Sequence, residues 1–276
     1  MDHVRLGELR DSRLELSASC TEKLENGTGD PEACLSFLVE YNLELAGLAL
    51  ALDSGDAVVG RHFAAAADAG KRWLTAPSER IGDVRRFEVA INSNPKSGTS
   101  SATIQERPVL VAPRGWKRGW DVGDFDIALS ILIAFGSADS ARQAAAVDEE
   151  SYRSPEVLAE EAYFIAVRAL KAWVLGDDSA AEANCRDALA NAKQPRLRAF
   201  AAAIATLFKD NAAGFPVALT DLVAAHRRSF AREPAMPVGV FSLSGLALCR
   251  MARTYGITIE DQLYLPTRFL NPDPIR

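Results

Sequence analysis

A wide apolar face between residues 31 and 52 limits this chain to folds that bury a central helix. Asp30-Pro31-Glu32 is a good helix start, because Asp can cap the first turn and Pro lacks only an N–H that the first turn leaves unpaired. The face consists of Leu35, Leu38, Leu45, Leu48 and Leu52, and Phe37, Leu43 and Leu50 extend it around the helix. This pattern predicts a mostly buried helix that ends near Leu52.

Helical periodicity continues through most of the remaining chain. We expect further helices at residues 4–26, 57–74, 140–147, 178–192, 195–210, 215–232 and 240–255. Ser154-Pro155-Glu156 predicts the start of another helix, which should stop at Gly176. The apolar run from Ile127 to Phe135 is compatible with a strand as well as a helix, and we predict a helix because its neighbours are helical.

Residues 85–115 differ from the rest of the chain. Phe87–Ile91 and Ala102–Gln105 alternate weakly between apolar and polar residues, and a stretch rich in Ser, Asn and Gly separates them. We therefore predict an all-α fold, a globular bundle of antiparallel helical hairpins, with a loop or short β-hairpin excursion near 85–115. We expect one domain over residues 1–276, with a possible subdivision into 1–84, 85–115 and 116–276.

A faint internal repeat gives an alternative to the globular bundle. Leu50–Asp56 and Ala172–Asp177 both end a helix in Gly-Asp and lead into an Ala-rich helix, and Leu207–Asn211 is a looser third copy. Such helical pairs are typical of tetratricopeptide-type repeats. The spacing of the copies is irregular, which favours a globular bundle over a solenoid.

Charge and hydropathy exclude several classes of protein. The formal net charge of −6 disfavours a nonspecific nucleic-acid binder, which needs a basic surface to neutralise phosphates. The N-terminal residues lack the apolar stretch of a signal peptide, and Ile127–Phe135 is far shorter than the roughly 20 residues of a membrane span. We therefore expect a cytoplasmic protein that binds neither nucleic acid nor membrane.

Residues that could carry chemistry are scattered. Four cysteines form no C-x-x-C pair and fall in helical patterns, so we expect buried, reduced thiols: Cys20, Cys34, Cys185 and Cys249. The histidines, His3, His62 and His226, have no ligand partner one turn away. Glu40 and Glu44 share a helix face without the Glu-x-x-His of a di-metal site, which indicates a polar strip. We expect no metal, no cofactor and no enzymatic activity.

The segment from Arg107 to Asp126 has the most unusual surface chemistry. Trp and Arg are enriched at binding hot spots because they bury a large area and keep a polar group. The candidate partner-binding residues are Arg114, Trp116, Trp120, Asp121, Asp124 and Asp126. Alternatively, the two tryptophans pack beneath the loop against the start of the following helix.

The C-terminal half contains a series of core and turn motifs. They are Ala201–Asn211, Phe215–His226, Leu246–Gly256 and the terminal Tyr264-Leu-Pro266. In these motifs the chain resembles the immunity protein 49 family of bacterial polymorphic toxin systems, most clearly over residues 201–270. The resemblance implies a cytoplasmic protein that binds one cognate toxin and blocks it. It provides no catalytic residues to assign and leaves the oligomeric state open.

Three functional hypotheses follow. In the first, the chain is a toxin-binding immunity protein that would place acidic and aromatic residues against a basic active-site cleft of the toxin, and its negative charge would speed association. In the second, the chain is a tetratricopeptide-like adaptor that binds a peptide or protein in a helical groove. In the third, it is an all-helical enzyme with a dispersed site, which would need a deep pocket lined by carboxylates or His62.

Overall fold

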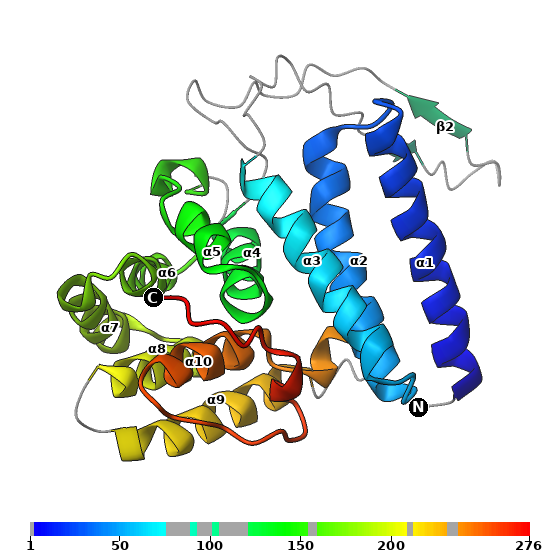
Figure 1. Cartoon of the computed structure of the whole chain (residues 1–276). Coiled ribbons are helices and arrows are strands. Elements are labelled where there is room, and N and C mark those ends of the chain that lie inside the picture. The colour runs from blue at the N-terminus through cyan, green and yellow to red at the C-terminus, as the bar shows by residue number, and fades with distance from the viewer. Residues whose placement is uncertain are drawn as a thin grey trace. The chain divides into compact units, whose positions relative to one another are not determined.

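The structure is a computed structural model that describes residues 3–75, 89–92, 101–104, 121–153, 159–208, 212–230 and 237–276. Apart from one short strand pair, these residues form an all-α fold, as predicted (Figure 1). The helices are α1 (His3–Glu25), α2 (Pro31–Ala51), α3 (Asp56–Thr75), α4 (Val122–Phe135), α5 (Ala138–Ala145), α6 (Glu161–Val174), α7 (Asp178–Asn191), α8 (Pro195–Leu207), α9 (Phe215–Phe230) and α10 (Leu243–Thr254). Short 3₁₀ turns add η1 (Glu149–Ser151), η2 (Ala212–Gly214), η3 (Pro237–Val240) and η4 (Thr267–Phe269).

Two short strands lie in the segment for which a loop or β-hairpin is predicted. Strands β1 (Val89–Asn92) and β2 (Ser101–Ile104) pair antiparallel, with Val89 opposite Ile104. By their internal contacts, residues 77–119 form one compact unit, and residues 1–76 and 120–276 form the other. The helices described below all belong to the second of these units.

Helical hairpins are the building blocks of this unit. Helices α1, α2 and α3 pack in series, and α6 with α7 and α8 with α9 form two further pairs (Figure 1). Helix α4 packs against α3 and also against α10, which is distant in sequence. A solenoid, in which each repeat contacts only its neighbours, would not join these two helices. The arrangement is therefore the predicted globular bundle.

The ends of the hairpin helices explain the faint repeat. After α6, Gly176 adopts a left-handed conformation (φ 85°), and the amide of Asp177 donates to the carbonyl of Ala172 at 2.9 Å. This is the Schellman closure that favours glycine. After α2 the left-handed residue that ends the helix is Asp53 (φ 51°) and not Gly55. The Gly-Asp pairs of the two copies therefore lie at different distances from the end of the preceding helix.

Helix α6 begins later than predicted. Residues 154–158, which contain the predicted start, lie outside the described residues, but Glu160 has extended backbone angles and α6 begins at Glu161. A hydrogen bond and an ion pair fix the chain at this point. The carboxylate of Glu160 accepts the amide of Lys193 at 3.0 Å, and Arg153 donates twice to Glu161 at 2.9 Å.

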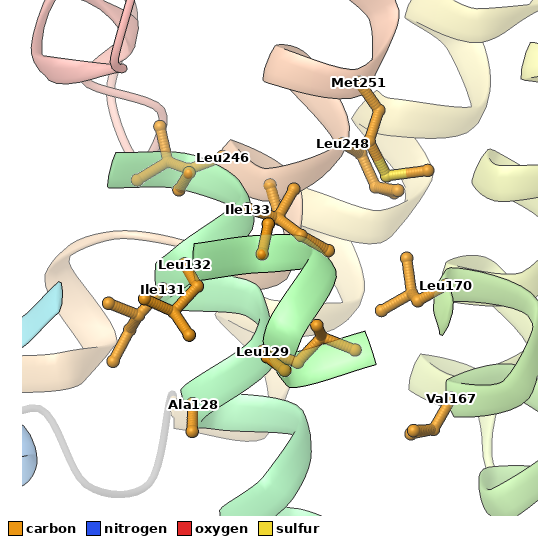
Figure 2. Packing of buried hydrophobic residues seen from close by; sticks show 14 of the residues in the cluster. Ala128, Leu129, Ile131, Leu132, Ile133, Val167, Leu170, Leu246, Leu248 and Met251 are labelled. Atoms are coloured by element: carbon orange, nitrogen blue, oxygen red, sulfur yellow. The ribbon is translucent and has the colours of Figure 1, made fainter. Parts of the chain in front are cut away.

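The core centres on α4, which is a helix rather than a strand. Its side chains meet those of α6 and α10 in one cluster that includes Leu129, Ile133, Leu170, Leu248 and Met251 (Figure 2). Helix α2 is also mainly internal, with twelve buried residues. It passes a length and hydropathy test for a membrane span, but 67% of the tested stretch is buried inside the protein, as in a core helix.

The C-terminal Tyr264-Leu265-Pro266 motif closes the start of α10. The amide of Ser242 donates to the carbonyl of Tyr264 at 2.8 Å, and the Ser242 hydroxyl caps α10 by accepting the amide of Gly245. Leu265 is fully buried beside Gly245. A Cβ atom on that glycine would lie 2.7 Å from Cδ2 of Leu265, so the two residues are complementary in size.

We expect Gly245→Ala to lower the free energy of unfolding by about 1–3 kcal/mol, the usual cost of overpacking a core. The added methyl group would overlap Leu265 and also approach the Ser242 hydroxyl at 3.0 Å. Urea denaturation followed by circular dichroism measures the change. Gly7→Ala in α1 is the control, because nothing lies within 4 Å of its added methyl group. The free energy of unfolding of the control should rise by about 0.5–1 kcal/mol. An equal rise for Gly245→Ala would contradict the close contact between Gly245 and Leu265.

Candidate functional site

The residues predicted to bind a partner divide into two groups. Arg114, Trp116 and Trp120 lie outside the described residues. Asp121, Asp124 and Asp126 are described and lie at the start of α4. The structure thus places the three carboxylates within two turns of one helix, and their contact with a partner stays a prediction.

Asp121 and Asp124 form a capping box at the N-terminus of α4. Asp121 Oδ1 accepts the amides of Gly123 at 2.6 Å and Asp124 at 3.1 Å, and Asp124 Oδ2 accepts the amide of Asp121 at 3.2 Å. Burial raises the pKa of the Asp124 carboxyl, and the hydrogen bond from Asp121 partly opposes that shift. Both side chains therefore stabilise the helix start.

Asp126 faces the interior, since only 5% of the residue is exposed. Its carboxylate accepts hydrogen bonds from the hydroxyls of Tyr163 at 2.9 Å and Ser130 at 3.3 Å. Burial raises the pKa of the Asp126 carboxyl, and these two hydrogen bonds oppose the shift. Reversing its charge would place an uncompensated cation in the core, so such a variant could not separate binding from folding.

We expect Asp126→Asn to stabilise the protein at pH 7 and to have no such benefit below about pH 3.9, the ordinary pKa of Asp. Because the folded-state pKa is raised, ionisation of Asp126 costs stability as the pH rises from the unfolded to the folded pKa. The amide avoids that cost and can still accept from Tyr163. Urea midpoints at pH 3 and pH 7 measure this, and a loss confined to pH 7 would contradict it.

His62, His226 and the four cysteines contact the interior, whereas His3 is exposed. His62 Nδ1 lies 3.2 Å from Asn42 Oδ1, and burial lowers the pKa of His226 to about 4. As predicted, all four cysteines are buried and unpaired. Glu44 differs from the predicted polar strip: it is 4% exposed and forms an ion pair with Arg13 of α1. Among the described residues, no group of three or more His, Cys, Asp or Glu side chains could hold a metal ion.

The candidate site is a shallow depression of about 270 Å³ between α3 and the C-terminal segment. We call it the aromatic depression. Its lining comes from three parts of the chain, namely α3, the end of α4 and the segment that contains η4. The lining residues are Gly60, Phe63, Ala64, Phe135, Phe269, Leu270, Asn271 and Pro272.

Stacked rings form the base of the aromatic depression. The ring of Phe63 stacks on Phe135 with centroids 4.2 Å apart and an interplanar angle of 14°. The ring centroid of Phe269 lies 5.7 Å from that of Phe63, and the ring of Phe241 meets Phe63 edge-on with centroids 5.1 Å apart. Only 1% of Phe63 is exposed, so its neighbours fix its position.

Polar groups around the aromatic depression are paired. Arg268 forms ion pairs with Asp56, at 3.0 Å, and with Asp261, and its guanidinium lies 4.6 Å from the ring centroid of Phe269. Asn271 Nδ2 donates to the carbonyl of Gly136 at 2.9 Å, and Asn271 Oδ1 accepts the amide of Asp273. Among the residues that line the depression there is no nucleophile and no acid–base pair.

Sequence reasoning missed the aromatic depression. Phe63, Phe135 and Phe269 belong to three segments that are distant in sequence and that only the tertiary fold brings together. In the sequence, each of them has the pattern of an ordinary core residue. The segment holding Phe269 adjoins the Tyr264-Leu-Pro266 motif that carried the family resemblance. That adjacency is the one signal that pointed to this region of the chain.

Comparison with known proteins identifies the family. The family model described as Immunity protein 49 matches residues 49–269, which include α3 to α10 and all of the aromatic depression except Leu270, Asn271 and Pro272. No curated protein and no solved structure gives a significant match to the chain. Because the family match covers well over half of its length, the chain belongs to the immunity protein 49 family.

Proposed function

We propose that this protein binds a cognate bacterial toxin by direct protein–protein contact in the cytoplasm and neutralises it, by occluding the toxin's active site. The observation that carries the proposal is the family match over residues 49–269. Inhibition by occlusion needs only a specific surface with good shape complementarity. It requires no catalytic group in this chain.

Two features of the chain support a protein partner. The net charge of −6 would speed association with a basic toxin surface, such as the cleft of an enzyme that attacks nucleic acid. The aromatic depression provides a preformed hollow at the surface, whose neighbouring Arg268 and Asn271 are held by contacts within the chain. The adaptor alternative is less favoured, because α10 packs on α4 instead of extending a regular repeat.

A pull-down of the tagged full chain from its own bacterium, with mass spectrometry of the retained proteins, tests the proposal. We expect one partner in a fixed ratio. Its expression alone should kill cells, and co-expression with this chain should restore viable counts. A retained partner that is harmless, a toxicity that this chain does not relieve, or the absence of any retained partner would contradict the proposal.

A further inference from the structure

A strongly charged surface lies at one end of the hairpin that α8 and α9 form. Five exposed cations gather there, and we call them the basic patch: Lys193, Arg196, Arg198, Arg227 and Arg228. We propose that the basic patch binds a cluster of carboxylates on the surface of the toxin. This inference rests on the proposed function and adds a second contact, opposite in sign to the contact with a basic cleft.

The packing of α8 on α9 brings the basic patch together. The two helices lie side by side and run in opposite directions, so the start of α8 and the end of α9 are neighbours (Figure 1). Three of the cations lie at the start of α8 or just before it, and two lie in the last turn of α9. Burial lowers the pKa of His226 in α9 to about 4, and the nearby charge of Arg196 adds to this shift. The cations of both helices therefore share one surface.

The basic patch lacks the carboxylate partners that arginines have elsewhere in the protein. Within the described ranges, nine other arginines form ion pairs and no member of the basic patch does. Helices α8 and α9 contain a single acidic residue, Asp221, seven positions before Arg228. That separation is about 10 Å along the helix axis, longer than the roughly 8 Å over which physiological salt screens a charge. The positive charge of the patch is thus largely uncompensated within its own hairpin.

Carboxylates from other elements that come near the basic patch are engaged with the interior or the backbone. Glu160 lies beside Lys193 and accepts its backbone amide at 3.0 Å. Asp126 is 5% exposed. Burial raises the pKa of Asp126, and the charge of Arg196 is one of the interactions that oppose this shift. These two acids act on the edge of the patch at Lys193 and Arg196, and they leave its other three cations to solvent or to a partner.

The chemistry of the basic patch fits carboxylates. Four of its five members are arginines, whose planar guanidinium can donate two parallel hydrogen bonds to one carboxylate. Their backbones belong to regular helices, and the guanidinium of Arg227 lies 5.3 Å from the ring centroid of Tyr264, which helps to hold it in place. Arginine is also enriched at the hot spots of protein interfaces. A group of Asp and Glu side chains on the toxin would therefore bind here favourably.

The charge around the basic patch favours a protein partner over a nucleic acid. The patch carries a formal charge of +5 and the whole chain carries −6, so the rest of the chain carries −11. A nucleic-acid strand extends beyond a patch of this size and would meet that negative surface, whereas a compact group of carboxylates would not. Strand binding also uses free aromatic rings for base stacking. The ring of Tyr264, beside the patch, already has Arg227 over one face.

Two double variants with the same change in charge provide the test. The patch variant combines Arg198→Glu with Arg228→Glu, and the control variant combines Arg5→Glu in α1 with Arg61→Glu in α3. All four arginines are exposed, and no ion pair joins any of them to another residue of the described ranges. Glu is a good helix former, so both variants should fold, which circular dichroism and the melting temperature would verify.

The experiment titrates the wild type and both variants with the purified protein that the tagged chain retains from its bacterium, and measures the Kd at physiological salt. We expect the patch variant to raise the Kd by about thirtyfold, because two attractive contacts become repulsive. The control variant should stay within about threefold of the wild type. Equal Kd values for the two variants, or tighter binding by the patch variant, would overturn the proposal.

A titration of the wild type with a fluorescein-labelled DNA duplex tests the other class of anionic partner. We expect a Kd above about 100 µM, weaker than ordinary nonspecific DNA binding. Tighter binding to the duplex that disappears in the patch variant would overturn the proposal and assign the basic patch to nucleic acid.

The outcomes separate this inference from the proposed function. If the retained protein is toxic, and both variants bind it and neutralise it equally, the proposed function stands and the contact at the basic patch fails. If the retained protein is harmless in cells and loses affinity for the patch variant alone, the contact stands for that partner and neutralisation fails.

Discussion

Arg250→Met is expected to lower the free energy of unfolding by about 3–5 kcal/mol, because it removes charged donors from several buried carbonyls at once. Arg250 lies in α10 and is 2% exposed. Its guanidinium donates to the carbonyls of Ile133 at 2.9 Å, Gly136 at 2.6 Å and Asp273 at 2.8 Å. One side chain thus joins α10, the C-terminal end of α4 and the C-terminal segment.

Urea denaturation of the purified chain measures the loss, and a second arginine of α10 provides the control. Arg253 is half-buried, and among the described residues its side chain donates one hydrogen bond, to the carbonyl of Thr267 at 3.1 Å. Arg253→Met should cost about 1 kcal/mol. Burial lowers the pKa of Arg250 to about 10, so the side chain is charged at neutral pH. Equal losses for the two variants would show that Arg250 does not have this bridging role.

Phe63→Ala is expected to cost about 3–5 kcal/mol, the usual effect of deleting a buried aromatic ring and leaving a cavity. Phe63 is 1% exposed, and its ring contacts Phe135, Phe241 and Phe269 from three other parts of the chain. The substitution removes the shared neighbour of all three rings. The substitution should therefore remove the base of the aromatic depression and also destabilise the protein.

The control for this prediction is Phe37→Ala in α2. Phe37 is 45% exposed and stacks only on Tyr41, at 5.8 Å, among the ring contacts described for it. We expect a loss of less than about 1 kcal/mol for a surface position of this kind. Thermal and urea unfolding of both variants make the comparison. A Phe63→Ala protein as stable as Phe37→Ala would contradict the assignment of Phe63 to the core.

Local signals predicted the helices well, because caps and periodicity act over a few residues. Asp30 caps α2 and Pro195 opens α8, as the sequence indicates. The predicted start at Ser154-Pro155 lies outside the described residues, and α6 begins at Glu161. There the ion pairs of Glu161 with Arg153 and the contact of Glu160 with Lys193 are tertiary, so no local pattern could reveal them.

The candidate site could not be predicted from the sequence for the same reason. Phe63 and Phe269 are far apart in the chain, and only the packing of the C-terminal segment brings their rings within 5.7 Å of each other. The sequence also did not reveal that Asp126 is buried. Its position next to Asp124 suggested a surface acid, but the helical turn directs its carboxylate inward to Tyr163. Whether a helical side chain points inward or outward depends on which face of the helix packs against the core.

The most direct test of neutralisation measures the activity of the purified toxin while increasing amounts of this protein are added. The retained partner is purified, its enzymatic or pore-forming activity is assayed, and this protein is added in increasing amounts. We predict a linear fall in activity that ends at a fixed stoichiometric ratio, as expected for tight binding that occludes the active site. Toxin activity that persists in the presence of excess folded protein would contradict the account.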